Sequence, residues 1–129
     1  MLRLLTEAEW ERAAKCGQDT VYAGSDIVGD VPWYEENSGR TTHSVGTRDA
    51  NACGLSDLSG NVLEWAHDWG EDTPGASTDP SVPATGTNRV LRGGAHSGSA
   101  NSARVACRGW NDPSLRGDYL GFRVGRTTR

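Results

Sequence analysis

Three histidines and three cysteines are the side chains of this chain best suited to catalysis or metal binding, and their spacing matches no common site. His43, His67 and His96 lie too far apart along the chain to ligate a metal from one element. His67 precedes Asp68, like a base beside its orienting carboxylate, but neighbouring residues of a strand point to opposite faces. The histidines therefore do not predict a catalytic set.

The three cysteines give a similar result. Cys16, Cys53 and Cys107 form no C-x-x-C pair, and their number is odd. This pattern argues against a disulfide framework and fits a reducing compartment, although it leaves room for a single bridge. Cys107 lies in a predicted loop, where a lone cysteine is more often a bystander than a nucleophile.

Residues 56–64, SDLSGNVLE, carry two carboxylates around a predicted turn. Asp57 and Glu64 each offer oxygen ligands, and a turn at Gly60 can aim backbone carbonyls inward. Hard cations such as Ca²⁺ prefer several such oxygens. The alternative is that both carboxylates cap amides of the turn, and the sequence leaves the two open.

Residues 95–119 have the composition of a recognition surface. They combine one Trp and one Tyr with many Ser, Gly, Asn and Asp residues. Aromatic side chains give large rigid contacts, and small polar residues give adaptable hydrogen bonds. The alternative is an ordinary polar loop.

The bulk composition limits the class of protein that can position these residues. The chain has 129 residues, which is the size of one domain, and a formal charge of -4, which disfavours nucleic-acid binding. It has 17 Gly and 5 Trp but only 1 Phe, and its mean hydropathy is -0.61. We expect a loop-rich domain whose core depends on tryptophan. No apolar run approaches membrane-spanning length.

The arginines concentrate in the C-terminal half, from Arg89 to Arg129. They are expected to bind backbone carbonyls and carboxylates of a loop-rich region, in preference to forming an anion-binding patch.

The pattern of elements predicts a small α+β domain. Thr6 and Glu9 form a capping box that opens a helix over residues 7–16, before Gly17. Strands are expected at residues 62–67, 88–92 and 120–125, with Leu63 and Trp65 on one face of the first. Residues 17–51 and most of 95–119 are expected to be irregular, and residues 71–87 a long surface loop. We expect a twisted antiparallel sheet with a helix on one side.

Four segments in order resemble one family. They are LRLLTEAEWERAAKCG, GLSDLSGNVLEWAHDW, RVLRGGAHS and GFRVGR. This pattern is similar to the formylglycine-generating enzyme and its sulfatase-modifying relatives. The resemblance spans nearly the whole chain and implies a C-type-lectin-like fold with little regular secondary structure, over a single domain of residues 1–129.

The resemblance also bears on catalysis. The oxidase members of the family bind copper with a cysteine pair shortly after R-G-G, because Cu(I) prefers thiolates. Those positions fall here on or near Gly98 and on Ser102 or Ala103, which carry no thiol. An iron-binding H-x-x-x-E-H-E motif of a related branch is also absent. We therefore expect no copper and no catalysis, with an oxidase or a degenerate relative of one as the alternative.

For the metal, the resemblance implies a structural calcium site. Its ligands are expected to be the side chains of Asp57 and Glu64 and the carbonyls of Gly60 and Val62. A second calcium site of the family falls on Asn37 and Ser38 and is expected to be lost or degraded, because its later aspartate has no clear counterpart.

Many relatives are rich in asparagine where residues 95–119 lie, while this chain keeps an arginine and glycine frame. This resembles the variable proteins of diversity-generating retroelements, in which copying errors at adenines change Asn codons. The ligand-binding residues are therefore expected to be His96, Ser97, Gly98, Ser99, Ser102, Cys107, Gly109, Trp110, Asn111, Asp112, Leu115, Gly117, Asp118 and Tyr119. A Trp codon cannot arise from an Asn codon through adenine changes alone, so Trp110 departs from this scheme.

The resulting hypothesis is a non-catalytic domain that binds a protein or a cell-surface ligand. In the family a longer N-terminal portion with a first strand precedes the helix. We therefore expect either a trimmed domain or a neighbouring chain that covers an exposed sheet edge, as in a homo-oligomer. The first residues do not resemble a signal peptide, and export by another route stays open.

Overall fold

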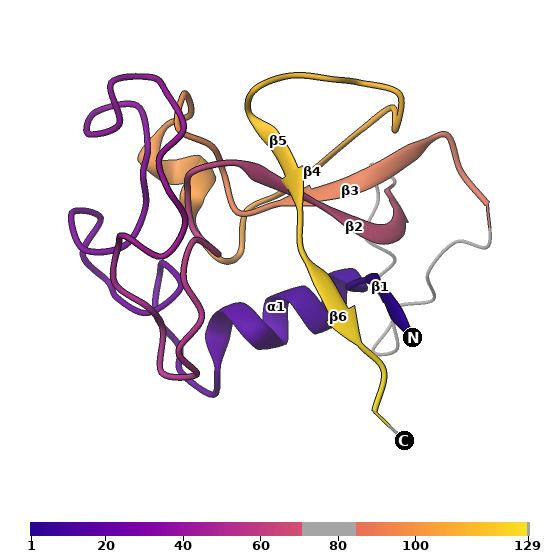
Figure 1. Cartoon of the computed structure of the whole chain (residues 1–129), viewed down its shortest axis with the longest axis horizontal. Helices are drawn as coiled ribbons and strands as arrows, with labels where there is room; N and C mark the ends of the chain where they lie inside the picture. The colour runs from indigo at the N-terminus through magenta and orange to yellow at the C-terminus, as the bar shows by residue number, and fades with distance from the viewer. Residues whose placement is uncertain (71–84, 129) are drawn as a thin grey trace.

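The computed structural model describes residues 1–70 and 85–128 and has the α+β architecture expected from the sequence (Figure 1). Its elements are β1 (Leu2–Leu4), α1 (Glu7–Lys15), β2 (Leu63–Gly70), β3 (Asn88–Arg92), the 3-10 turn η1 (Ala100–Ala103), β4 (Arg108–Asn111), β5 (Leu120–Phe122) and β6 (Val124–Arg126). The predicted loop at residues 71–87 falls, apart from its last three residues, outside the described part of the chain.

Helix α1 forms as its capping pattern predicts. The Thr6 hydroxyl accepts from the Glu9 amide, and the Glu9 carboxylate accepts from the Thr6 amide, so both ends of the capping box are present. The helix ends at Lys15, one residue before the predicted limit, and the next residue, Cys16, is the C-cap and adopts the left-handed conformation at φ 46°. Trp10 and Ala14 are its buried residues.

The central sheet has the strand order β4-β3-β2-β5. The β2–β3 and β3–β4 pairs are antiparallel, as expected, whereas β5 runs parallel to β2. The prediction of a wholly antiparallel sheet is therefore wrong at β5. The reason is topological, because a long connection after β4 crosses the sheet before β5 begins (Figure 1). Strand β4 itself lies in a segment that was predicted to be irregular.

Strand β2 presents its buried face to α1. Glu64, Ala66 and Asp68 alternate on that face and are buried, while Leu63 and Trp65 share the opposite, half-buried face. The Glu64 carboxylate accepts from the Trp10 indole at 2.8 Å, and the Asp68 carboxylate accepts from the Glu7 amide at 3.1 Å. These contacts fix the helix beneath the sheet in Figure 1.

The C-terminal segment that was predicted as one strand divides at Arg123. Before it, β5 joins the central sheet, and after it, β6 pairs antiparallel with β1 in a separate two-stranded sheet. The Arg123 guanidinium binds Glu64 at 2.9 Å and the Ser56 carbonyl at 2.8 Å. A partly buried ion pair therefore lies at the bend between the two sheets.

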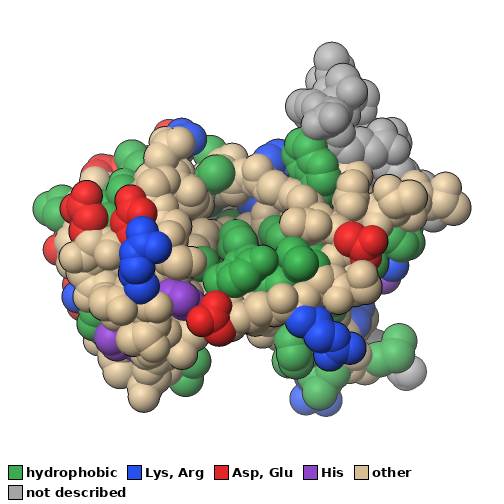
Figure 2. All heavy atoms as spheres, turned by 90° about the horizontal axis from the view of Figure 1, so that it is seen from above, with side chains coloured by type: hydrophobic (Ala, Val, Ile, Leu, Met, Phe, Trp, Pro, Cys, Tyr) green, Lys and Arg blue, Asp and Glu red, His purple; other side chains and the backbone are tan. Residues whose placement is uncertain are grey.

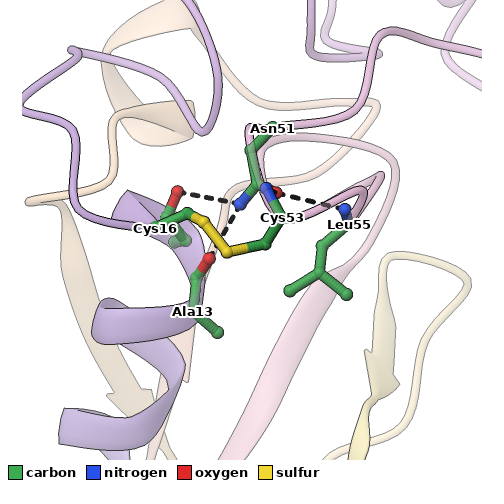
Figure 3. Close-up of a disulfide and its surroundings, with 6 residues drawn as sticks. Ala13, Cys16, Asn51, Cys53 and Leu55 are labelled. Carbon is green, nitrogen blue, oxygen red and sulfur yellow. Dashed lines mark hydrogen bonds between the residues drawn. A yellow bond between two sulfur atoms is a disulfide. The ribbon is translucent and has the colours of Figure 1, made fainter.

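A disulfide joins Cys16, at the end of α1, to Cys53 (Figure 3). The two Cα atoms are 5.8 Å apart. Beside it, the Asn51 amide donates to the Ala13 and Ala14 carbonyls at the last turn of the helix. The single bridge that the cysteine count left open is thus present, and it ties the irregular segment to α1.

The core lies between α1 and this irregular segment. One cluster consists of Trp10, Ala14, Ala23, Leu58 and Val105, and a second of Tyr22, Val31 and Ala103. Within residues 1–70 and 85–128, no helix has the length and hydropathy needed to cross a membrane.

Candidate functional site

Strand β4 sets the geometry of the site, because its residues alternate between the two faces of the sheet. Arg108 points towards α1 and donates two hydrogen bonds to Glu7, at 2.7 and 2.8 Å. Trp110 shares that face, with its ring centroid 5.9 Å from the Arg108 guanidinium carbon. Gly109 faces the opposite side and pairs with Leu91 of β3.

A cavity of about 300 Å³ opens on this opposite side. Leu63 and Leu91 line it from the sheet. Six of the fourteen predicted ligand-binding residues line it as well, namely Ser97, Gly98, Ser102, Cys107, Gly109 and Tyr119. Figure 2 views the molecule from the side away from α1 and shows hydrophobic side chains grouped at the hollowed centre of this face. Ser97 and Tyr119, which are 22 positions apart in sequence, thus line the same cavity.

Two glycines hold the backbone beside the cavity in a form that other residues would not adopt. Gly93 and Gly94 have φ angles of 99° and 72°. A Cβ on Gly94 would lie 2.8 Å from the Ala103 Cα, and one on Gly93 would lie 2.8 Å from the Leu58 carbonyl oxygen. The R-G-G frame therefore has a steric cause.

Two of the three glycines among the predicted ligand-binding residues differ from this frame, whereas a Cβ on the third, Gly117, would lie 2.5 Å from Cε1 of Tyr119. A Cβ on Gly98 would have its nearest neighbour at 3.5 Å, and a Cβ on Gly109 would meet nothing within 4 Å. Neither residue has a positive φ. A side chain at either position fits the backbone without strain, and at Gly109, which lines the cavity, it would enter open space.

An ion-pair network supports the strands from beneath. Glu7 Oε1 lies 2.7 Å from Nη1 of Arg92 and 2.7 Å from Nε of Arg108, and Arg92 also contacts Glu11 at 3.2 Å. Burial opposes ionisation of Glu7, but hydrogen bonds from Arg108 and Arg92 lower its pKa from the ordinary value. Arg92 further donates to the Val105 carbonyl at 2.8 Å. The expectation that these late arginines bind carboxylates and carbonyls is confirmed for Arg92, Arg108 and Arg123.

His96 was predicted as a contact residue but is only 2% exposed, so it offers no free surface. Its backbone amide donates to the Asn61 carbonyl, and its Nε2 lies 3.3 Å from the Asp118 carbonyl oxygen. His96 is therefore a buried residue that contacts the backbone of Asp118.

Trp110 also departs from its predicted place, since it lies on the helix side of β4 and does not line the cavity. A Cβ on Gly70 would lie 2.5 Å from the Trp110 Cβ, so Trp110 packs closely over the end of β2. Trp110, which adenine changes in an Asn codon could not produce, thus points away from the cavity.

The other predicted contact residues do not line the cavity. Ser99, Asn111, Asp112, Gly117 and Asp118 are exposed, and Leu115 is half-buried. Asp112 accepts from the Ser114 amide and hydroxyl, which lower its pKa and stabilise a local turn.

The residues predicted to bind calcium make several contacts within the protein. The Glu64 carboxylate accepts from Trp10 and Arg123, and Asp57 Oδ2 accepts from the Gly46 amide at 2.7 Å. Asp57 Oδ1 is buried and, among the described residues, accepts no hydrogen bond. Calcium binding by Asp57, Gly60, Val62 and Glu64 stays a prediction.

At the predicted second calcium site, the side chains of Asn37 and Ser38 both donate hydrogen bonds to backbone carbonyls. The Asn37 amide donates to the Pro32 carbonyl at 3.0 Å, and the Ser38 hydroxyl donates to the His96 carbonyl at 2.6 Å.

His67 and Asp68 lie on opposite faces of β2, as strand alternation predicts, with His67 exposed and Asp68 buried. Burial raises the pKa of Asp68. In the described part of the chain, no three His, Cys, Asp or Glu residues gather as metal ligands.

The cavity residues that sequence reasoning missed include Leu63 and Leu91. Both lie on predicted strands, but their shared face was not linked to the later loop. The alternation of side chains along β2 and β3 could have indicated which face these two leucines share. The register that pairs Leu91 with Gly109 could not be read from the sequence.

The chain is similar to several known proteins. The model of the sulfatase-modifying factor enzyme 1-like domain matches residues 2–128. Formylglycine-generating enzyme from Thermomonospora curvata is 34% identical over 145 residues, which cover 94% of this chain and 48% of that protein. The chain therefore spans about half the length of this curated relative.

Two solved structures are similar in fold. Treponema denticola variable protein 1 has a TM-score of 0.88 and 42% identity, covering 95% of this chain and 46% of the other. PvdO from Pseudomonas aeruginosa has a TM-score of 0.79 and 31% identity, covering 95% and 51%. With its C-type-lectin-like fold and its nearly full-length family match, this chain belongs to the formylglycine-generating-enzyme, or sulfatase-modifying factor, family.

Proposed function

We propose that this chain is a non-catalytic ligand-binding domain whose cavity face varies between gene copies, as in variable proteins diversified by retroelements. The observation that carries the proposal is the contrast between two sets of glycines. Gly93 and Gly94 have no room for a Cβ, whereas Gly98 and Gly109 have room and ordinary backbone angles. Tolerated and forbidden positions thus line one cavity, which suits a rigid frame that displays changeable side chains.

The similarity to Treponema denticola variable protein 1 supports the same proposal. The partner is a protein or a cell-surface ligand, because an open face that combines Tyr119 with small polar residues suits contact with a macromolecule. Networks such as Glu7 with Arg92 and Arg108 keep the backbone of β3 and β4 fixed while side chains on the other face change.

The alternative is an oxidase of the formylglycine-generating type, and one observation favours it. Cys107 lines the cavity with a free thiol. Against it, the chain has three cysteines, and the other two form the Cys16–Cys53 bridge. A copper site that needs two thiolates at the cavity lacks its second ligand within this chain.

The proposal is tested with two displayed libraries. One randomises the six cavity positions Ser97, Gly98, Ser102, Cys107, Gly109 and Tyr119. The matched control randomises six exposed positions elsewhere, namely Gln18, Asp19, Thr41, Thr42, Asp49 and Ala52. Both are selected against the same purified protein targets.

We expect most members of the cavity library to fold and to yield binders for several targets, and the control library to yield few. A cavity library that is mostly unfolded, or a control library that yields as many binders, would contradict the proposal. The oxidase alternative has its own test, which is incubation with copper and a cysteine-containing peptide. Conversion of the cysteine to an aldehyde would establish catalysis.

A further inference from the structure

We infer that the cavity of this sequence accepts an aromatic side chain that its ligand carries next to a cationic group. The inference rests on the proposed function and adds the chemistry of the ligand. Three features of the described residues carry it: a lining without free charge, an aromatic wall, and an exposed carboxylate at the edge.

The lining offers an apolar surface with its charges already compensated. Leu63, Leu91 and Ala95 contribute aliphatic groups, and the hydroxyls of Ser97 and Ser102 contribute the polar side chains. Arg92 and Arg108 contribute to the lining as well, but both are ion-paired on the helix side of the sheet, Arg92 with Glu7 and Glu11 and Arg108 with Glu7. An anionic ligand group would find no uncompensated guanidinium here, whereas an apolar group gains free energy when its surface leaves water.

The size and the wall favour an aromatic group. The cavity of about 300 Å³ is large enough for a ring system, and Tyr119 is the aromatic residue that lines it. Ring pairs gain energy in stacked or edge-to-face arrangements beyond the area they bury. Because Gly109 leaves open space beside Leu91, a ring can lie flat against β3 and β4.

The cationic preference comes from Asp118. The next residue in sequence, Tyr119, lines the cavity. The Asp118 carbonyl oxygen lies 3.3 Å from Nε2 of His96, and the two sequence neighbours of His96, Ala95 and Ser97, also line the cavity. The Asp118 side chain is 82% exposed. Within the described ranges, its carboxylate has no Lys or Arg partner at ion-pair distance, and its nearest cationic candidate is His96 at 3.9 Å.

The test uses three small probes in an NMR titration of the whole chain at neutral pH. Tryptamine carries an indole and an ammonium group, indole-3-propionate carries an indole and a carboxylate, and butylamine carries an ammonium group alone. We expect tryptamine to shift the resonances of Leu91, Gly109 and Tyr119, and to bind about threefold more tightly than indole-3-propionate, as an exposed charge pair allows. Butylamine should leave these resonances unchanged.

Two variants with matched controls assign the binding. Gly109→Leu fills the cavity and should weaken tryptamine at least about tenfold, because the variant removes the space for the ring. Gly29→Leu is the control, since Gly29 also has nothing within 4 Å of its Cβ position. Asp118→Asn should equalise tryptamine and indole-3-propionate, whereas Asp19→Asn, an exposed change elsewhere, should not.

The inference is overturned if no probe shifts the cavity resonances, if indole-3-propionate binds as tightly as tryptamine, or if Gly109→Leu leaves tryptamine binding intact. These outcomes are separate from failure of the proposed function. A cavity library that folds and yields binders would still support the proposed binding face, even if this sequence has no preference for an aromatic cation.

Discussion

The Glu7 carboxylate and the Arg92 guanidinium meet at 2.7 Å beneath the cavity, and the Arg92 side chain is only 2% exposed. Glu7 is the first residue of α1, and Arg92 is the last residue of β3. The same carboxylate binds Arg108 of β4, so one side chain joins the helix to two strands. Residues on the other face of those strands line the cavity.

Replacing Glu7 with Gln should destabilise the fold by about 3 kcal/mol or more, because it leaves the buried Arg92 charge without its closest partner. Urea unfolding measures this change. Glu11→Gln is the control, since Glu11 is 38% exposed and lies 3.2 Å from Arg92, and its effect should be smaller. Equal effects of the two variants would show that the network does not centre on Glu7.

Glu9 gives a prediction about pH. The hydrogen bond from Arg3, followed by that from the Thr6 amide, lowers the pKa of Glu9 from 4.5 to about 2. A lowered pKa in the folded state contributes stability that is present above pH 4.5 and lost as the pH falls towards 2. The Glu9→Gln variant should therefore show a shallower loss of stability across this window. Arg3→Met should flatten the profile in part, and a Glu9→Gln profile parallel to the wild type would contradict the assignment.

The Cys16–Cys53 bridge should contribute about 4 kcal/mol, the loop-closure value for its sequence separation of 37. Reducing the protein, or making the Cys16→Ser and Cys53→Ser double variant, should lower the unfolding midpoint accordingly. Cys107→Ser should leave the midpoint nearly unchanged, because this thiol is free. Insensitivity of the wild type to reductant would show that the two cysteines are not bridged in solution.

The glycine contrast can be measured directly. Gly94→Ala should cost at least about 2 kcal/mol, because φ is 72° and the new Cβ would lie 2.8 Å from the Ala103 Cα. Gly109→Ala should change stability by less than about 0.5 kcal/mol, as expected for a strand position with open space. Thermal melts of both variants test this. If Gly109→Ala is as damaging as Gly94→Ala, position 109 does not belong to a tolerant face.

The sequence predicted the local elements better than their arrangement. The capping box at Thr6 and Glu9 and the bounds of β3 follow from local chemistry and were predicted closely. The parallel partner of β2 and the break at Arg123 depend on contacts between distant segments, such as Arg123 with Glu64. Local patterns cannot report such contacts.

The same reason explains the mixed prediction of the site. Composition identified the C-terminal segment, and six of its predicted residues share one cavity. Composition could not show that Trp110 and Gly109 lie on opposite faces of β4, since that segment showed no strand pattern. Nor could it show that His96, a polar residue in a polar loop, is buried beneath Asp118.

The most direct test of the account is a map of where a bound partner lies. Hydrogen exchange on a selected cavity-library member, with and without its target, supplies this map. We predict slower exchange at residues 97–102, 107–109 and 117–120 when the target is bound, and unchanged exchange in α1. Protection confined to α1 or to β1 and β6, with the cavity unprotected, would contradict a binding face on this side of the sheet.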